Sequence, residues 1–119
     1  MCTGALRMAT VGALTYLGAD PVNGTAWVLE SARYVGHRPI EVTGPCADET
    51  GRLASGLAVA YHLWHRASGQ YVAAYRKVRP DLLAVGMTLI DAGMFDLAAG
   101  RHPWSDAAPV LLGAVRQAV

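Results

Sequence analysis

The chain contains little cysteine: Cys2 and Cys46 are the only two in 119 residues. Two thiols cannot form the disulfide framework that stabilises many small exported domains. The first residues, MCTGALRMATVGAL, also lack the form of a signal peptide, because Arg7 interrupts the apolar stretch and no basic segment precedes it. We therefore expect a reducing cytoplasm, where cysteine serves as a metal ligand or as a nucleophile.

The chain also lacks an excess of charge and any long apolar run. Ten basic residues against nine acidic ones leave a net charge of +1, which is not the electrostatic footprint of a dedicated nucleic-acid binder. Each apolar stretch is interrupted by Arg, Asp, Gly or Pro before it reaches membrane-spanning length, so no membrane partner is expected. Hydrophobic residues make up 53%, which is enough for one packed core.

The N-terminal half alternates between helical and extended patterns. Helical spacing is expected over 3–11 and 25–36, and compact runs rich in β-formers predict strands over 13–19 and 38–45. A strand, a helix and a strand form a βαβ unit, whose strands are parallel and whose crossover is right-handed. The expected fold class is therefore α/β.

A long amphipathic helix is predicted from Asp48 or Glu49 to about Arg66. Its apolar residues share one stripe, as in a helix packed on a sheet: Leu53, Leu57, Ala60, Tyr61 and Trp64. Residues 67–119 are expected to be helical throughout and are interpreted as a C-terminal appendage to a domain spanning 1–66.

The inventory of strands is small for an α/β domain. Two parallel strands make a poor sheet, and the first strand would leave its outer edge unpaired. The chain is therefore expected to be the second half of a larger sheet.

Four short motifs carry a resemblance to a known family. They are M-C-T-G-A-L at 1–6, G-A-D-P at 18–21, H-R-P-I-E-V at 37–42 and A-D-E at 47–49. In this order they resemble the zinc-dependent cytidine/deoxycytidylate-type deaminase superfamily, in the branch of the tRNA adenosine deaminases and guanine deaminases. The resemblance covers 1–66 and implies part of a three-layer α/β/α sandwich. It also implies a nucleoside or nucleobase substrate, with RNA as a possible partner.

The family's chemistry uses zinc held by one His and two Cys, with a separate Glu that moves protons. These residues come from H-x-E and P-C-x-x-C motifs. By resemblance, Cys2 corresponds to the second cysteine and is the one metal ligand present. The first cysteine, the His and the Glu would precede Met1, so we expect a truncated or mis-started deaminase that is inactive as this chain alone.

Other residues have simpler interpretations. Without the resemblance, Cys2 would be an inert N-terminal cysteine. His62 and His65 lie three residues apart on the long helix, but Cys46 is about four turns away, so surface histidines are expected rather than a metal site. Asp20 forms a turn or, in an intact enzyme, approaches substrate near the strand ends.

The acidic pair Asp48 and Glu49 is expected to cap the long helix rather than to act in catalysis. One basic and aromatic cluster is present, and a solvated helix face is favoured over a polynucleotide contact: Arg66, Tyr71, Tyr75, Arg76, Lys77 and Arg79. Several apolar residues of the last helices are expected to fill the core or an interface: Met87, Met94, Phe95, Leu97 and Trp104. The alternative function is a non-catalytic deaminase-fold interaction module or accessory subunit, which docks on a partner or on its own copy through the exposed strand edge and the apolar C-terminal helices. A homo-oligomer is expected.

Overall fold

The computed structural model describes residue 6 and residues 11–20, 40–65 and 69–118. The helix predicted at 25–36 lies outside these ranges. So does the helix predicted at 3–11, apart from Leu6, which is helical, and Val11, which is not.

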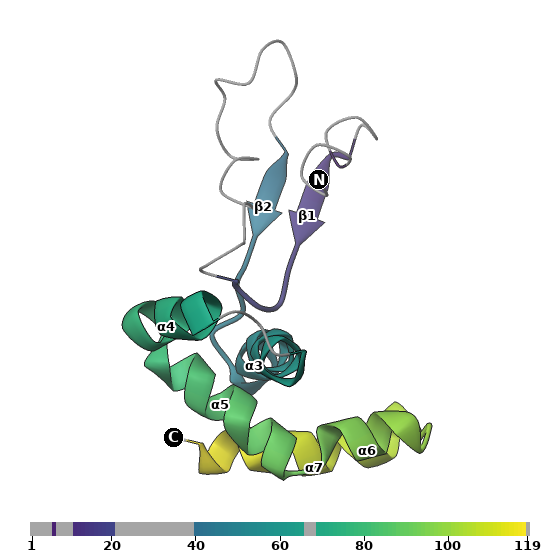
Figure 1. The fold of residues 1–119 in the computed structure, drawn as a ribbon. Helices are drawn as coiled ribbons and strands as arrows, with labels where there is room; N and C mark the ends of the chain where they lie inside the picture. The colour runs from purple at the N-terminus through teal and green to yellow at the C-terminus, as the bar shows by residue number, and fades with distance from the viewer. Residues whose placement is uncertain (1–5, 7–10, 21–39, 66–68, 119) are drawn as a thin grey trace.

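The sheet is a parallel pair. Strand β1 (Ala13–Thr15) pairs with β2 (Glu41–Thr43), with Leu14 opposite Val42. The α/β class and the parallel pairing are therefore confirmed, although both strands are shorter than predicted. In Figure 1 both arrows point toward the helices, so the carboxyl ends of the strands meet the helical part of the molecule.

Five helices follow the sheet. They are α3 (Glu49–Trp64), α4 (Gly69–Val78), α5 (Pro80–Asp91), α6 (Met94–Ala99) and α7 (Trp104–Gln117). Their starts follow local rules: the Asp48 side chain accepts a hydrogen bond from the Gly51 N–H at 3.0 Å, and Pro80 occupies the first turn of α5. Among the described residues, no helix combines the length and the apolarity needed to cross a bilayer.

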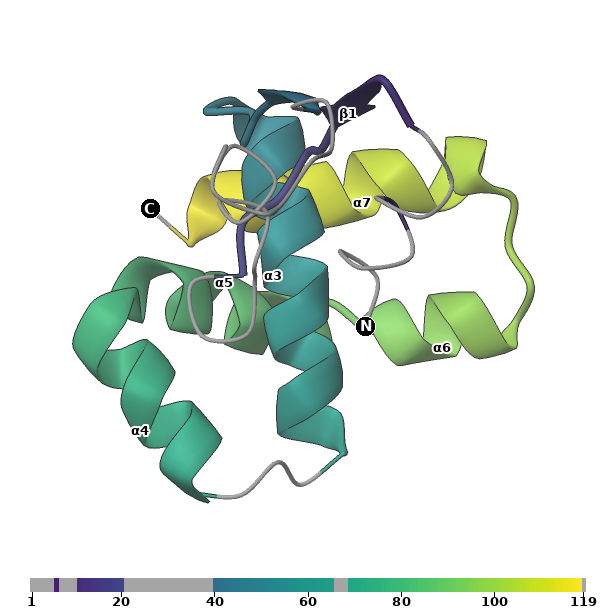
Figure 2. The same cartoon turned by 90° about the horizontal axis from the view of Figure 1, so that it is seen from above.

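Helix α3 packs on other helices. It crosses α5 and α7, as Figure 2 shows, and these three helices share a core built around Leu53, Val85, Leu89 and Leu111. A second cluster, which includes Val59, Tyr75 and Leu82, joins α3 to α4 and α5. The expectation that α3 lies mainly on the sheet was wrong, because strands of three residues with half-exposed side chains offer it little apolar surface. Segments on both sides of residue 66 contribute to the same core.

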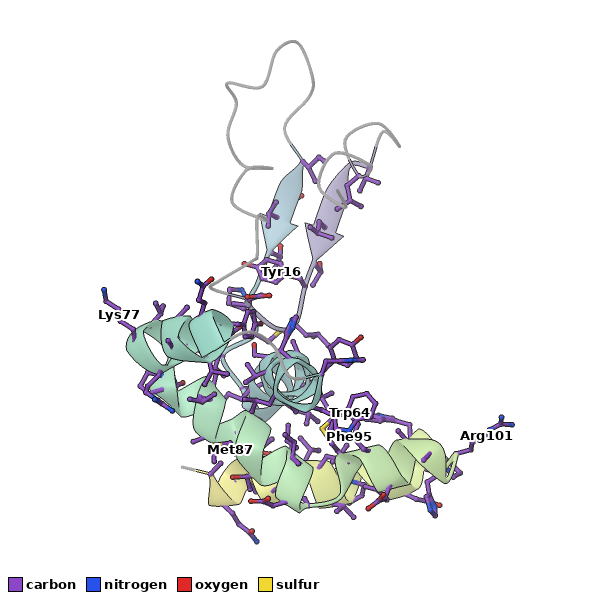
Figure 3. All side chains as sticks on the ribbon, in the orientation of Figure 1. Tyr16, Trp64, Lys77, Met87, Phe95 and Arg101 are labelled. Carbon is purple, nitrogen blue, oxygen red and sulfur yellow. The ribbon has the colours of Figure 1, made fainter. Side chains whose placement is uncertain are left out.

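The apolar stripe of α3 is buried only along part of its length. Leu53 and Ala60 are buried, whereas Tyr61 and Trp64 are about half exposed because they lie at the end of the helix, beyond its main packing partners. Trp64 stacks on Phe95 of α6, with ring centroids 4.6 Å apart (Figure 3).

The apolar residues expected to fill the core or an interface differ in their burial. Met94 and Leu97 are partly buried and pack against the core, whereas Met87 and Trp104 are 55% and 61% exposed. Met87 and Trp104 therefore do not fill the core of the chain.

Candidate functional site: a cavity at the carboxyl ends of the strands

The segments that follow the two strands are held together by the backbone. The Tyr16 N–H donates to the Thr43 carbonyl and the Cys46 N–H donates to the Leu17 carbonyl, both at 3.0 Å. This pairing extends the strand contact to the first turn of α3. Ligand sites of open α/β sheets gather at this edge.

Gly51 allows α3 to approach these segments closely. A Cβ atom at this position would collide with the Cys46 carbonyl and would lie 2.9 Å from the Leu17 carbonyl oxygen. Backbone atoms cannot move aside as a flexible side chain can, so any larger residue at 51 would push α3 away from the sheet.

A cavity of about 320 Å³ lies where these segments meet α3 and the start of α5. Its walls come from four parts of the chain: Ala19 after β1; Pro45, Cys46 and Ala47 after β2; Gly51, Arg52 and Ser55 on α3; Arg79 and Leu82 at α5. Among the described residues, its charged lining residues are both arginines.

The two arginines differ in their partners. Arg79 donates from Nε and Nη2 to the two carboxylate oxygens of Asp81, at 2.9 and 2.7 Å, and these bonds hold the pKa of Asp81 below its usual value. The Arg52 guanidinium makes no hydrogen bond or ion pair with the residues that the structure describes, and its interaction with Glu49 is Coulomb attraction alone.

Two smaller polar groups complete the lining. Ser55 is only 7% exposed, and none of the described residues forms a hydrogen bond with its hydroxyl. Cys46 carries a free, partly buried thiol. The Ser55 hydroxyl can donate one hydrogen bond and accept others, so it is suited to a ligand or to water.

The carboxylates around the cavity already have partners. Asp48 caps α3, as the sequence predicted. Glu49 accepts from Arg116 at 2.8 and 2.9 Å, which lowers the pKa of Glu49. Asp20 accepts from the Tyr75 hydroxyl at 2.9 Å. Burial, followed by hydrogen bonding to Tyr71 and Asp20, raises the pKa of Tyr75.

The predicted metal ligand, Cys2, lies outside the described residues. Within those residues, no group of three or more His, Cys, Asp or Glu side chains could hold a metal ion. His62 is partly buried rather than fully solvated, because its ring lies against that of Tyr71 at a centroid distance of 4.2 Å. His65 is exposed, as expected.

Arg66 of the basic and aromatic cluster lies outside the described residues, and the described members do not form one surface. Arg76 and Lys77 are exposed on α4, and Lys77 points away from the body of the molecule in Figure 3. Tyr75 is 1% exposed and belongs to the core, so it is not available for stacking on a base.

The sequence reasoning missed Arg52 and Ser55. Both follow the strand end at helical spacing from Asp48, which places them on one face of α3. That spacing was readable from the sequence. The contribution of Arg79 was not, because it depends on how α5 packs against α3.

No known protein family, no curated protein and no solved structure matches this chain.

Proposed function

We propose that this chain supplies the C-terminal part of a zinc-dependent base deaminase. The complete fold would be a three-layer α/β/α sandwich that removes an exocyclic amine from a nucleoside or nucleobase, free or within RNA, in the cytoplasm. Cys2 would be its metal ligand within this chain. A single thiolate does not build the four-coordinate site that zinc prefers, so this polypeptide alone is not expected to deaminate a base.

The parallel pairing of β1 and β2 is the observation that supports the proposal best. Two residues separate the end of β1 from the motif G-A-D-P, and three separate the end of β2 from A-D-E, which leads into α3. Two of the motifs that carry the resemblance thus meet at the strand edge where α/β enzymes bind ligands. The cavity at that edge gives a substrate a place to bind.

The genomic sequence upstream of the Met1 codon tests this proposal directly. We expect an open frame that encodes H-x-E and ends in P-C-x, together with a native protein mass that includes this segment. A stop codon just upstream, with a native mass that starts at Met1, would contradict it.

Zinc content gives a second test with a matched control. In the protein that includes the upstream segment, Cys2→Ser should abolish bound zinc and ammonia release, whereas Cys46→Ser should retain the zinc. For the 119-residue chain with added zinc, we expect no ammonia above background from cytidine, adenosine or guanine. Ammonia released at enzymatic rates would contradict the expectation that the other zinc ligands and the proton-transferring Glu precede Met1.

A second candidate function is a non-catalytic module that binds another copy of itself. A mainly apolar groove of about 240 Å³ lies between α3, α6 and α7, and its lining includes Leu57, Leu97 and Leu111. Trp104, which is 61% exposed, lines the same groove. Large exposed apolar patches mark interaction surfaces, which favours this candidate.

Sedimentation equilibrium over a range of concentrations tests the self-association. We expect dimers that Trp104→Ala weakens and that Met87→Ala, an exposed control on α5, leaves unchanged. A monomer at all concentrations, or equal effects of both substitutions, would argue against this candidate.

A further inference from the structure

From the cavity at the strand ends we infer that it binds the phosphate group of a small molecule. Arg52 is the principal anion-binding residue, with Arg79 and Ser55 as additional donors. This inference goes beyond the proposed deaminase function and does not depend on it.

The donors in the cavity exceed the acceptors that the described residues offer them. A guanidinium carries five N–H groups in a planar fork that matches phosphate oxygens. The Arg52 guanidinium forms no hydrogen bond within the described chain, and Arg79 uses two of its five N–H groups on Asp81. Ser55, a residue that is 7% exposed, adds a hydroxyl that has no hydrogen-bond partner among these residues.

None of the described carboxylates near the cavity forms a hydrogen bond or an ion pair with Arg52. The Asp48 side chain caps α3, and Asp20 accepts a hydrogen bond from Tyr75. Glu49 forms an ion pair with Arg116, and Asp81 forms one with Arg79. The backbone N–H groups of the first turn of α3 are not the main phosphate-binding groups, because the Gly51 N–H already donates to the Asp48 side chain. Arg52 is therefore the cavity guanidinium that has no hydrogen-bond partner among the described residues.

The size of the cavity limits the ligand to a small molecule. Its volume of about 320 Å³ lies at the small end of ligand sites. The lining also includes Ala19, Pro45 and Leu82, which can contact an apolar or planar portion of the ligand. A phosphorylated small molecule with its phosphate at Arg52 fits this distribution of charge.

Protection of Cys46 from alkylation reports on this site. The 119-residue chain is treated with iodoacetamide at constant ionic strength, with inorganic phosphate or with chloride, and each cysteine is quantified by peptide mass spectrometry. Phosphate should slow modification of Cys46, which lines the cavity, and should leave the rate at Cys2 unchanged. Equal rates at Cys46 in phosphate and chloride would overturn the inference.

Two variants distinguish phosphate binding at this cavity from nonspecific electrostatic attraction to the protein surface. Titration calorimetry with inorganic phosphate should show affinity reduced about tenfold or more in Arg52→Gln, as expected for a lost charge-assisted hydrogen bond. Arg76→Gln, at an exposed position on α4, should bind like the wild type. Equal losses in both variants would identify nonspecific attraction and overturn the proposal.

Ser55→Ala serves as the second variant if Arg52→Gln fails to fold. It should weaken phosphate binding severalfold without lowering the melting temperature measured in the absence of phosphate. If Arg52→Gln does not fold, unchanged phosphate affinity in Ser55→Ala would contradict the assignment; if it folds, its own unchanged affinity would do so. Because none of these measurements involves deamination, failure here and failure of the proposed function are distinguishable.

Discussion

Replacing Gly86 by alanine should destabilise the protein, because α3 and α5 approach one another closely at this glycine. A Cβ atom at position 86 would lie 2.7 Å from Cγ1 of Val59 and 3.1 Å from the backbone nitrogen of Ala60. Val59 is fully buried and its side chain is stiff at χ1, while the Ala60 nitrogen belongs to the helix backbone. Neither atom can move without shifting α3 as a whole.

The expected magnitude follows from two opposing contributions. Overpacking a close contact costs about 1–3 kcal/mol. Alanine in place of glycine within a helix contributes about 1 kcal/mol of stability. A substitution at Gly113 in α7 measures the helix-propensity contribution without the overpacking cost, because a Cβ atom there meets nothing within 4 Å. Gly113→Ala should therefore stabilise the protein by about 1 kcal/mol, and the two variants should differ by about 1–3 kcal/mol.

Urea denaturation followed by far-ultraviolet circular dichroism provides the measurement. We expect the midpoint for Gly86→Ala to lie on the order of 1 M below that for Gly113→Ala, with the same m-value. If both substitutions raised the midpoint equally, α3 and α5 would not be in the close contact described here. The assembly of the cavity would then also be wrong, because α5 carries Leu82 and begins directly after Arg79.

Three further outcomes are expected. Tyr75→Phe removes the hydrogen bond to Asp20 and should lower the free energy of unfolding by about 1–3 kcal/mol in urea. Leu89→Ala empties a fully buried position between α3 and α7, so calorimetry should show a loss of roughly 2–5 kcal/mol. Since Arg79 lowers the pKa of Asp81, their pair stabilises the fold above the usual carboxyl pKa and is lost as the pH falls through the lowered value. Both side chains are partly exposed, so the effect is at most about 1 kcal/mol. Between pH 7 and pH 3, Asp81→Asn should therefore lose less stability than the wild type, and an identical pH dependence would contradict this.

Local rules account for what the sequence analysis predicted correctly. Compact runs rich in β-formers identified both strands, and the long helix was recognised by its periodicity and by the Asp48 cap. These signals depend on residues within one or two turns of each other, so they can be read along the chain. The extent of burial was harder to predict. Trp64 continues the apolar stripe of α3, and yet its side chain is about half exposed, with its ring stacked on Phe95.

The sequence by itself determined the positions of the two strands and of the long helix, the parallel direction of the strands, and the Asp48 cap and Pro80 that start α3 and α5. Only the tertiary structure decided that α3 packs on α5 and α7, and that Arg52 and Arg79 line one cavity. These two arginines come to line the same cavity because α3 packs closely against α5, and no local sequence pattern indicates this. The physical reason is that contacts between distant segments depend on the sizes of the residues facing each other, such as Gly86 and Val59, and these are matched only once the helices have packed.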